Sequence, residues 1–585
     1  MRLVHPPLRL IGSLLWRLEH AFERARAMDA SGRGTRLRIF AVMFGFALLF
    51  GWIATGAAHS ALMSGTPSVA TRMLPDAVGR ADIVDRNGQL LATNIRHYAL
   101  YVQPDEVWDR AHAVRAIRRA VPRVPERQLR NAMEASRRAY VMGGLEPAER
   151  EALMALGLGG IYFENEDRRV YPLGGTAAHL VGFTDSHGGA ISGVERALDT
   201  RVRASGARGQ PVPLSIDLRV QAALEQELRA AMADQQATGA VGIVTDVHTG
   251  EILALASLPD FDPNRQGEMA DERKLNRAAA SVYEMGSTFK IFTVAMALDA
   301  GIARLDTTFD ATEPLRVGGR AVRDFHAQNR VMTTEEVFLH SSNIGTSRMN
   351  IGLGGDRVRG YFEGFGLLAP APSGLPEAAR PRQPPNWRDQ TLISLSYGYA
   401  TMVTPLHMAA SVGAIMNGGL YVPLTLEPRG REAVPQGHRV VSEETSRQML
   451  HLMRQNVVRG SGTRADIPGL RVGGKTGSAE KAVNGRYDRT RMVSSFASVF
   501  PSEGALDAPR YLVFILIDEP RGSAATHGLR TAGFVAAPVA GRVIDRIAGF
   551  LGVERLDDPR LHRYVARDPL PETLSDLSLL AEYAQ

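Results

Sequence analysis

Along the chain, the first clear segment in the pattern of apolar and polar positions is an uncharged apolar run at residues 39–58. It follows an arginine-rich stretch at residues 1–38. Twenty residues at the rise of a helix span about 30 Å, the thickness of a bilayer's hydrocarbon core. Arginines precede the run closely, whereas the next arginine is Arg72, so the positive-inside rule places residues 1–38 in the cytoplasm. We expect a single N-terminal transmembrane helix. A cleaved signal peptide is the alternative, because small residues such as Ala57 and Ala61 lie near its end.

Between residues 68 and 230, short apolar runs alternate with polar helical ones. The sequence Asp-Arg-Asn-Gly at 85–88 lies between apolar runs and predicts a tight turn. Helical periodicity follows near 106–137 and 147–156. The segment shows no catalytic constellation, and we interpret it as an elongated pedestal or dimerisation-like domain.

A new pattern begins with an amphipathic helix near 214–236, where Asp217 is the predicted N-cap. Two strands joined at a turn near 248–250 follow, and late strands are predicted at 491–500 and 511–518. The patterns between them are mostly helical, with a proline-rich loop at 370–385. For residues 231–556 we therefore expect an α+β domain, an antiparallel sheet packed by an inserted helical lobe. Residues 557–585 form a polar tail.

Composition narrows the functional classes. Net charge is +6, but positive and negative residues are interspersed, without the basic stripe of a nucleic-acid-binding protein, so no nucleic-acid partner is expected. There is no cysteine, which excludes disulfides and thiolate metal sites, and the histidines form no recognisable metal motif. Only four of the 68 basic residues are lysines, at 274, 290, 475 and 481. Arginine cannot lose its proton at accessible pH, so each lysine is a candidate general base.

Ser287 and Lys290 are three residues apart at the start of an apolar helical pattern, which places them on one helix face. A serine hydroxyl beside an amine whose pKa falls on desolvation forms a nucleophile and base pair that needs no histidine. Such a pair often arises by chance, but here Ser341-Ser-Asn343 and Lys475-Thr-Gly477 follow it in order.

Each further motif residue has a chemical role. The Ser341 hydroxyl can pass a proton between Lys290 and a leaving amine, and Asn343 can orient Lys290 and hold a substrate amide. Lys475, Thr476 and Ser478 can present one charge and two hydroxyls to a terminal carboxylate, while Gly477 leaves room for a substrate strand. The backbone N–H groups of Ser287 and Ser478 are candidates for an oxyanion hole.

This order of three motifs resembles that of penicillin-binding proteins and serine β-lactamases. The resemblance to class B penicillin-binding proteins covers roughly residues 68–550, and the segments 169–199 and 396–410 are most similar to the division-specific, septal member. The motifs that carry it are Asp85-Arg-Asn-Gly88, Tyr171-Pro, Ala178-His-Leu-Val-Gly-Phe183, Gly193-Val-Glu195, Asn276-Arg-Ala278, Ser396-Tyr-Gly-Tyr399 and Val403-Thr-Pro-Leu406.

The resemblance implies a bacterial inner-membrane D,D-transpeptidase with a periplasmic catalytic domain that cross-links peptidoglycan stem peptides through an acyl-Ser287 intermediate and is inhibited by β-lactams. It implies no cofactor. Too few residues remain for a glycosyltransferase domain, so we expect a polytopic glycosyltransferase and other division proteins as partners. The alternatives are an elongation-specific class B enzyme, a D,D-carboxypeptidase or β-lactamase, and a β-lactam sensor or scaffold.

The sequence departs from the family pattern at a few positions. Ser478 stands where threonine is more frequent but keeps a hydroxyl, Ala400 stands where glycine is common, and His407 where glutamine is common. His340 lies beside the second motif; a structural role is expected for it, because a serine and lysine pair already supplies a base.

Overall fold

The computed structural model describes residues 79–185, 188–265, 271–434 and 437–556, together with residues 20, 42, 44–46, 48 and 50–52. The chain divides into two compact units, Met1–Ala77 and Val78–Gln585. Most of the predicted tail and membrane segment, and the whole of 557–585, lie outside the described residues.

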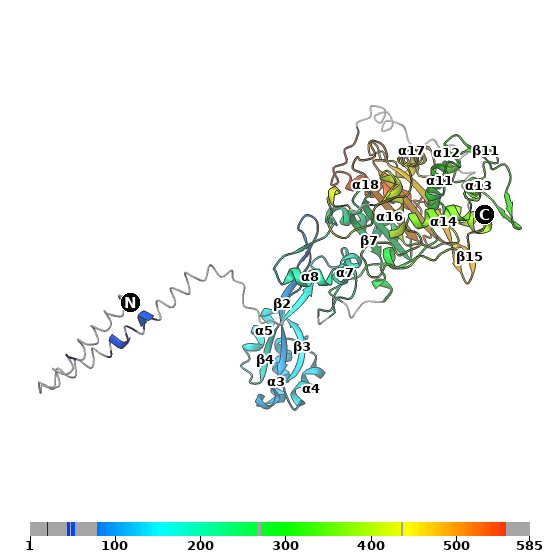
Figure 1. The fold of residues 1–585 in the computed structure, drawn as a ribbon. Coiled ribbons are helices and arrows are strands. Elements are labelled where there is room, and N and C mark those ends of the chain that lie inside the picture. The colour runs from blue at the N-terminus through cyan, green and yellow to red at the C-terminus, as the bar shows by residue number, and fades with distance from the viewer. Residues whose placement is uncertain are drawn as a thin grey trace, which may run out of the picture. The chain divides into compact units, whose positions relative to one another are not determined.

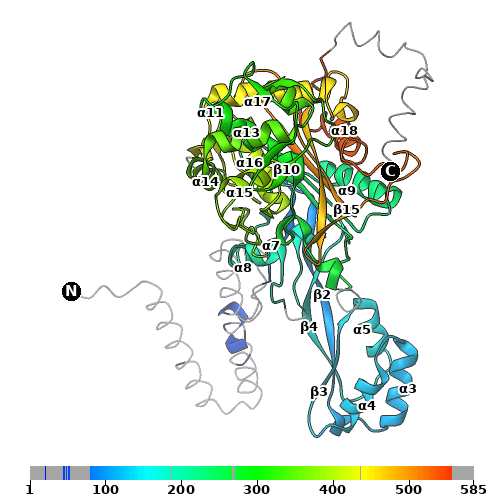
Figure 2. The ribbon, with the colours of Figure 1, turned by 90° about the vertical axis from the view of Figure 1, so that its right-hand side faces the viewer.

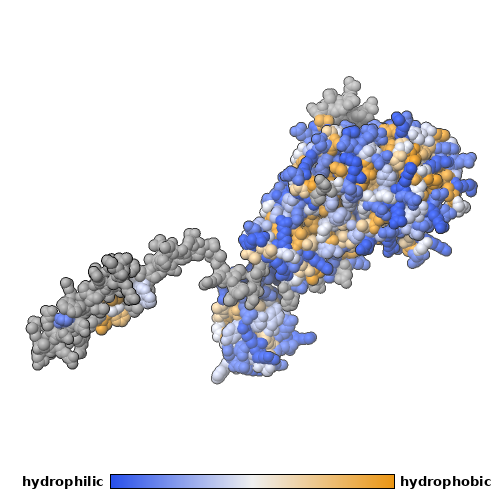
Figure 3. Space-filling model, in the orientation of Figure 1, coloured by the Kyte–Doolittle hydropathy of each residue, from blue (hydrophilic) through white to orange (hydrophobic). Residues whose placement is uncertain are grey.

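The described residues of the predicted membrane segment are helical. Their large apolar side chains are exposed, including Phe46, Leu48 and Phe50, and Figure 3 colours such residues as hydrophobic. Within the described part of the chain, no helix reaches the length and apolar character that a membrane crossing requires.

The sheet of the pedestal is organised by one long strand, β2 (Leu90–Val102). It pairs with β1 (Ile83–Val84), β3 (Ala139–Leu145) and β4 (Ile161–Val170), all antiparallel, while β1 also pairs in parallel with β5 (Val212–Pro213). A separate apolar core lies between the outer half of this sheet and its helices. Those helices are η1 (Pro104–Glu106), α3 (Arg110–Ala120), α4 (Glu126–Glu134) and α5 (Pro147–Met154).

The predicted turn at 85–88 also joins the pedestal to the catalytic domain. One Asp85 carboxylate oxygen accepts hydrogen bonds from the N–H groups of Asn87 and Gln89, both at 2.8 Å, and closes the turn. The other accepts from the N–H of Leu218, at 3.1 Å, in the first turn of α9 (Leu218–Asp234). Because Asp85 is buried, these donors replace the hydrogen bonds that its carboxylate would otherwise form with water.

A buried ionic cluster holds the base of the pedestal together. Glu195, fully buried in α7 (Gly193–Ala197), accepts hydrogen bonds from Arg80 at 2.6 Å and from Arg169 at 2.6 Å. Arg80 also pairs with Asp199. Because a buried carboxylate is tolerated only when it is paired, these contacts fix β4 against α7 and the first described residues of the unit. The flanking helices are α6 (Ala178–Val181) and α8 (Asp199–Gly206).

The catalytic domain is built on a five-stranded antiparallel sheet in the order β14-β15-β16-β6-β7. Figure 2 shows α9 and α18 on one face and the helical lobe on the other. The two faces belong to two apolar cores, so the central strands are buried on both sides. The strands are β6 (Gly239–Asp246), β7 (Ile252–Leu258), β14 (Gly473–Val483), β15 (Arg486–Phe500) and β16 (Tyr511–Asp518), and α18 spans Ala536–Ile547.

The helical lobe is formed by the part of the chain between β7 and β14. Figure 1 shows its helices α11, α13, α14, α16 and α17 gathered together. The predicted sheet with an inserted helical lobe is confirmed, but the lobe also contains three small two-stranded ladders that the periodicity did not predict. Its helices are η3 (Asp271–Lys274), α10 (Arg277–Ala280), η4 (Gly286–Phe289), α11 (Lys290–Asp299), α12 (Thr334–Leu339), α13 (Asn343–Leu353), α14 (Gly355–Gly364), α15 (Asp389–Ser396), α16 (Pro405–Met416), η5 (Arg431–Ala433), α17 (Glu443–Arg459) and η6 (Thr463–Ala465). The ladders pair β8 (Thr308–Asp310) with β11 (Val331–Thr333), β9 (Leu315–Val317) with β10 (Arg320–Val322), and β12 (Leu420–Tyr421) with β13 (His438–Arg439).

Candidate active site

Ser287 lies in the 3-10 turn η4, immediately before α11, where two glycines allow η4 to pack closely against its neighbours. A Cβ on Gly477 would lie 2.6 Å from the Met285 carbonyl oxygen and 2.8 Å from the Thr288 nitrogen. Gly286 has a φ of 55°, and a Cβ there would lie 2.6 Å from the Ser478 carbonyl oxygen. The third motif is therefore pressed against the turn that carries the nucleophile, and the space at Gly477 that was expected to admit a substrate strand is taken up by η4.

Lys290 begins α11 and is fully buried. Its Nζ is hydrogen bonded to the Ser341 carbonyl oxygen, to Ser341 Oγ at 3.1 Å and to Asn343 Oδ1 at 2.8 Å. Burial, together with the charge of Lys475, holds the pKa of Lys290 well below its usual value. Within the described part of the chain, the Ser287 hydroxyl forms no hydrogen bond. The expected nucleophile and base, three residues apart in sequence, are therefore not bonded directly to each other in this structure. Such bonds often tighten only when substrate is present.

Ser341 links two lysines. Its Oγ lies 3.1 Å from Lys290 Nζ and 3.1 Å from Lys475 Nζ. A neutral amine has only two hydrogens, so a neutral Lys290 cannot donate to all three of its acceptors at once. The arrangement is satisfied when Lys475 donates to the Ser341 hydroxyl and that hydroxyl donates to Lys290. Ser341 is held at a φ of 56°, a conformation that non-glycine residues adopt at a cost and that often marks functional sites.

Asn343 is fixed on both sides of its amide. Its Oδ1 contacts Lys290, and its Nδ2 donates to the Arg323 carbonyl oxygen at 3.0 Å. The neighbouring Asp324 accepts from Ser342 Oγ at 2.7 Å and from the Ile344 N–H at 2.9 Å. Its charge also favours protonation of Lys290. Sequence reasoning missed both Arg323 and Asp324, because they follow a short strand with no periodic signal.

The Lys-Thr-Gly motif lies within the edge strand β14, which is not among the strands expected from the sequence. Lys475 is fully buried, and burial lowers its pKa to about 7. Thr476 Oγ1 lies 2.6 Å from Ser461 Oγ, and Ser478 Oγ accepts a hydrogen bond from the Ala532 N–H at 3.0 Å. The eight predicted site residues thus come from η4, α11, the turn between α12 and α13, the start of α13 and β14, and the structure brings these segments together. Among the described residues, no group of acidic or histidine side chains is placed to hold a metal ion.

A second set of side chains, also missed from the sequence, connects β14 to the segment at 396–400. Tyr399 Oη accepts from the Glu480 N–H at 3.1 Å. Glu284 accepts from Tyr487 Oη at 3.1 Å and from the Ala400 N–H at 3.0 Å, and burial raises the pKa of Glu284. Ala400 has a φ of 64°, which explains why glycine is favoured at this position in the family that the sequence resembles.

The two histidines singled out in the sequence have different surroundings. His340 is exposed at the end of α12, and its ring forms no hydrogen bond with the residues that the structure describes. His407 is buried in the first turn of α16, where its ring contacts Thr404 Oγ1 at 2.7 Å and the Ala369 carbonyl oxygen at 2.7 Å. Burial lowers the pKa of His407, so the ring is neutral and caps the helix.

Two family models match the chain: the penicillin binding protein transpeptidase domain over residues 240–545 and the penicillin-binding protein dimerisation domain over residues 75–204. A relative from Caulobacter vibrioides, named probable peptidoglycan D,D-transpeptidase FtsI, is 52% identical over 560 residues, 94% of this chain and 95% of the relative. This chain is a class B penicillin-binding protein.

More distant class B relatives share most of its length. The peptidoglycan D,D-transpeptidase FtsI of Escherichia coli is 30% identical and is matched over 82% of this chain and 84% of its own. The crystal structure of penicillin binding protein 3 from Mycobacterium tuberculosis, in complex with aztreonam, superposes with a TM-score of 0.63 at 26% identity, covering 82% of this chain and 98% of that one. This chain therefore has the two-domain architecture, a dimerisation domain followed by a transpeptidase domain, that its two family matches describe.

Proposed function

We propose that this class B penicillin-binding protein is the D,D-transpeptidase of septal peptidoglycan synthesis, and that β-lactams inhibit it by acylating Ser287. The observation that carries the proposal is the Ser341 hydroxyl, which contacts two fully buried lysines, Lys290 and Lys475. Lys290 directly follows the turn η4 that carries the nucleophile. Such a pair supplies a base for acylation and a cation for a substrate carboxylate in the same cleft.

In acylation, the Ser287 oxygen attacks the carbonyl carbon of the penultimate D-alanine, and Lys290, whose lowered pKa favours its uncharged form, receives the serine proton. The terminal D-alanine leaves as an amine that takes this proton through Ser341. Lys475, Thr476 and Ser478 hold the terminal carboxylate, and the stem peptide lies along the edge strand β14. An amine of a neighbouring stem then resolves the acyl-enzyme.

The test is to supply the purified full-length protein with a donor stem and an amine acceptor together. Dimeric muropeptide is the expected product. Exclusive release of shortened stems would identify a carboxypeptidase instead, and acylation without any turnover would favour the sensor or scaffold.

The septal and membrane assignments rest on further support. Residues 169–199 and 396–410 resemble the septal member, and the described residues of 42–52 expose apolar side chains, as a helix facing lipid or a polytopic partner would. The catalytic domain is then periplasmic and residues 1–38 cytoplasmic. A fluorescent fusion that marks the side wall rather than the division site would favour the elongation-specific alternative.

The pH dependence of acylation should have an alkaline limb set by Lys475. With a pKa of about 7, Lys475 carries its charge below that pH and loses it above, so attraction for a donor carboxylate falls as pH rises through about 7. The second-order acylation constant should fall by up to about tenfold per pH unit there. Stopped-flow acylation between pH 5 and 9 measures it. Lys475→Arg keeps the charge at every pH, so a limb that persists in that variant would assign it to another group.

A further inference from the structure

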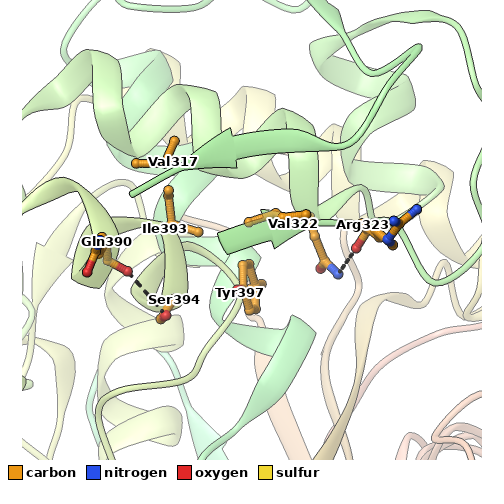
Figure 4. A pocket seen from close by; sticks show the side chains of 9 residues that line it. Val317, Val322, Arg323, Gln390, Ile393, Ser394 and Tyr397 are labelled. Carbon is orange, nitrogen blue, oxygen red and sulfur yellow. Dashed lines mark hydrogen bonds between the residues drawn. The ribbon is translucent and has the colours of Figure 1, made fainter. Parts of the chain in front are cut away.

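A cavity of about 190 Å³ lies beside the catalytic cluster and shares Asn343 with it. Figure 4 shows side chains that line the cavity, among them Val322, Arg323 and Tyr397. One wall is the β9–β10 hairpin and the residue after it, Arg323; the other is α15 and Tyr397, which follows it. A water molecule takes up about 30 Å³ in the liquid, so the volume suits a fragment about the size of one amino acid.

The position of the cavity suits the second substrate of a transpeptidase. After acylation, the donor stem lies along the edge strand β14, on one side of Ser287. The attacking amine must reach the acyl carbonyl where a base can take its proton, which is the side of Lys290, Ser341 and Asn343. The cavity opens beside the last of these residues.

The chemistry of the cavity favours a peptide fragment with a carboxylate. Arg323 is exposed, and its guanidinium forms no ion pair or hydrogen bond with any residue that the structure describes. The neighbouring Asp324 forms no ion pair with it among the described residues, and its two oxygens accept from Ser342 and Ile344. Gln390 and Ser394 add an amide and a hydroxyl, and the valines of the hairpin add an apolar wall.

We propose that this cavity is the acceptor subsite and that Arg323 is a specificity-determining residue that pairs with a carboxylate near the attacking amine. This rests on the proposed transpeptidase function. In the step concerned, the acceptor nitrogen forms a C–N bond with the acyl carbon while the bond from that carbon to Ser287 Oγ breaks. The proton lost by the amine passes through Lys290 and Ser341 to the Ser287 oxygen, so the enzyme is regenerated.

The experiment compares two stem-peptide acceptors, one with a free carboxylate beside the attacking amine and one in which that carboxylate is amidated, with one thioester donor and the full-length protein. The partition of the acyl-enzyme between acceptor and water is measured against acceptor concentration. Arg323→Gln should lower the preference for the free carboxylate over the amidated one by about tenfold, the loss expected for a partly screened charge-assisted hydrogen bond. Arg323→Lys should retain part of that preference, and Arg316→Gln, on the same hairpin but outside the cavity, should retain all of it.

An unchanged preference in Arg323→Gln, or an equal loss with both acceptors, would overturn the assignment of Arg323 while the proposed function stands. A wild-type protein that forms no acyl-enzyme with the donor would overturn the proposed function itself, and the subsite with it.

Discussion

Replacing Ser287 with alanine is expected to abolish covalent labelling of the full-length protein by a fluorescent penicillin. The change removes the hydroxyl oxygen of η4 that is proposed to form the acyl bond. It should leave the fold intact, because Ser287 is half-buried and its hydroxyl forms no hydrogen bond among the described residues. Loss of labelling can therefore be attributed to the chemistry.

Gel fluorescence after denaturation measures this labelling, and peptide mapping should locate the label on Ser287 in the wild type. Ser341→Ala is the matched control: it removes the hydroxyl between the two lysines but keeps the nucleophile, so labelling should continue at a lower rate. Full labelling of Ser287→Ala, with circular dichroism unchanged, would remove Ser287 from the mechanism.

Much of the catalytic domain could be predicted because its signals are local. The helix capped by Asp217 begins at Leu218, the two strands expected on either side of the turn at 248–250 lie at β6 and β7, and the strand expected at 511–518 lies at β16. Periodicity and caps report on such elements whatever their tertiary surroundings. In the pedestal, the helical stretch expected over 106–137 is divided, and two helices separated by a loop at 121–125 replace it.

What the sequence could not show depends on contacts between distant segments. The contact between Asn343 and the Arg323 carbonyl joins residues that no pattern relates, and the φ of 56° at Ser341 follows from packing. The small ladders such as β9–β10 have three residues per strand, too few for a period of two to be recognised. These short elements carry the loops that complete the site.

The scarcity of lysine was informative at two of the four positions. Lys290 and Lys475 are fully buried and contact the same hydroxyl, where a group that can lose its proton is needed. Lys481, in contrast, pairs with Asp518 at 2.9 Å and Glu519 at 2.7 Å, a role that arginine could fill. Residue type alone does not separate these cases, but burial and partners do.

Lys290→Arg is expected to lower the acylation rate constant by about 10³-fold, within the range found when a general base is removed. Arginine keeps the positive charge but cannot give up its proton at accessible pH, so it cannot activate Ser287. A factor of 10³ corresponds to about 4 kcal/mol of activation free energy. Stopped-flow measurement with a chromogenic β-lactam gives the constant directly.

Because an arginine at a fully buried position can also disturb packing, Lys290→Gln is the second variant. Glutamine is shorter and uncharged and can still donate to Ser341 and Asn343, so it separates loss of the base from overpacking. Lys481→Arg controls for the exchange itself and should acylate at the wild-type rate, since its salt bridges survive. If Lys290→Gln acylated within tenfold of the wild type, the proton of Ser287 would have to go to another acceptor, and Lys475, whose pKa is about 7, is the nearest described candidate through Ser341.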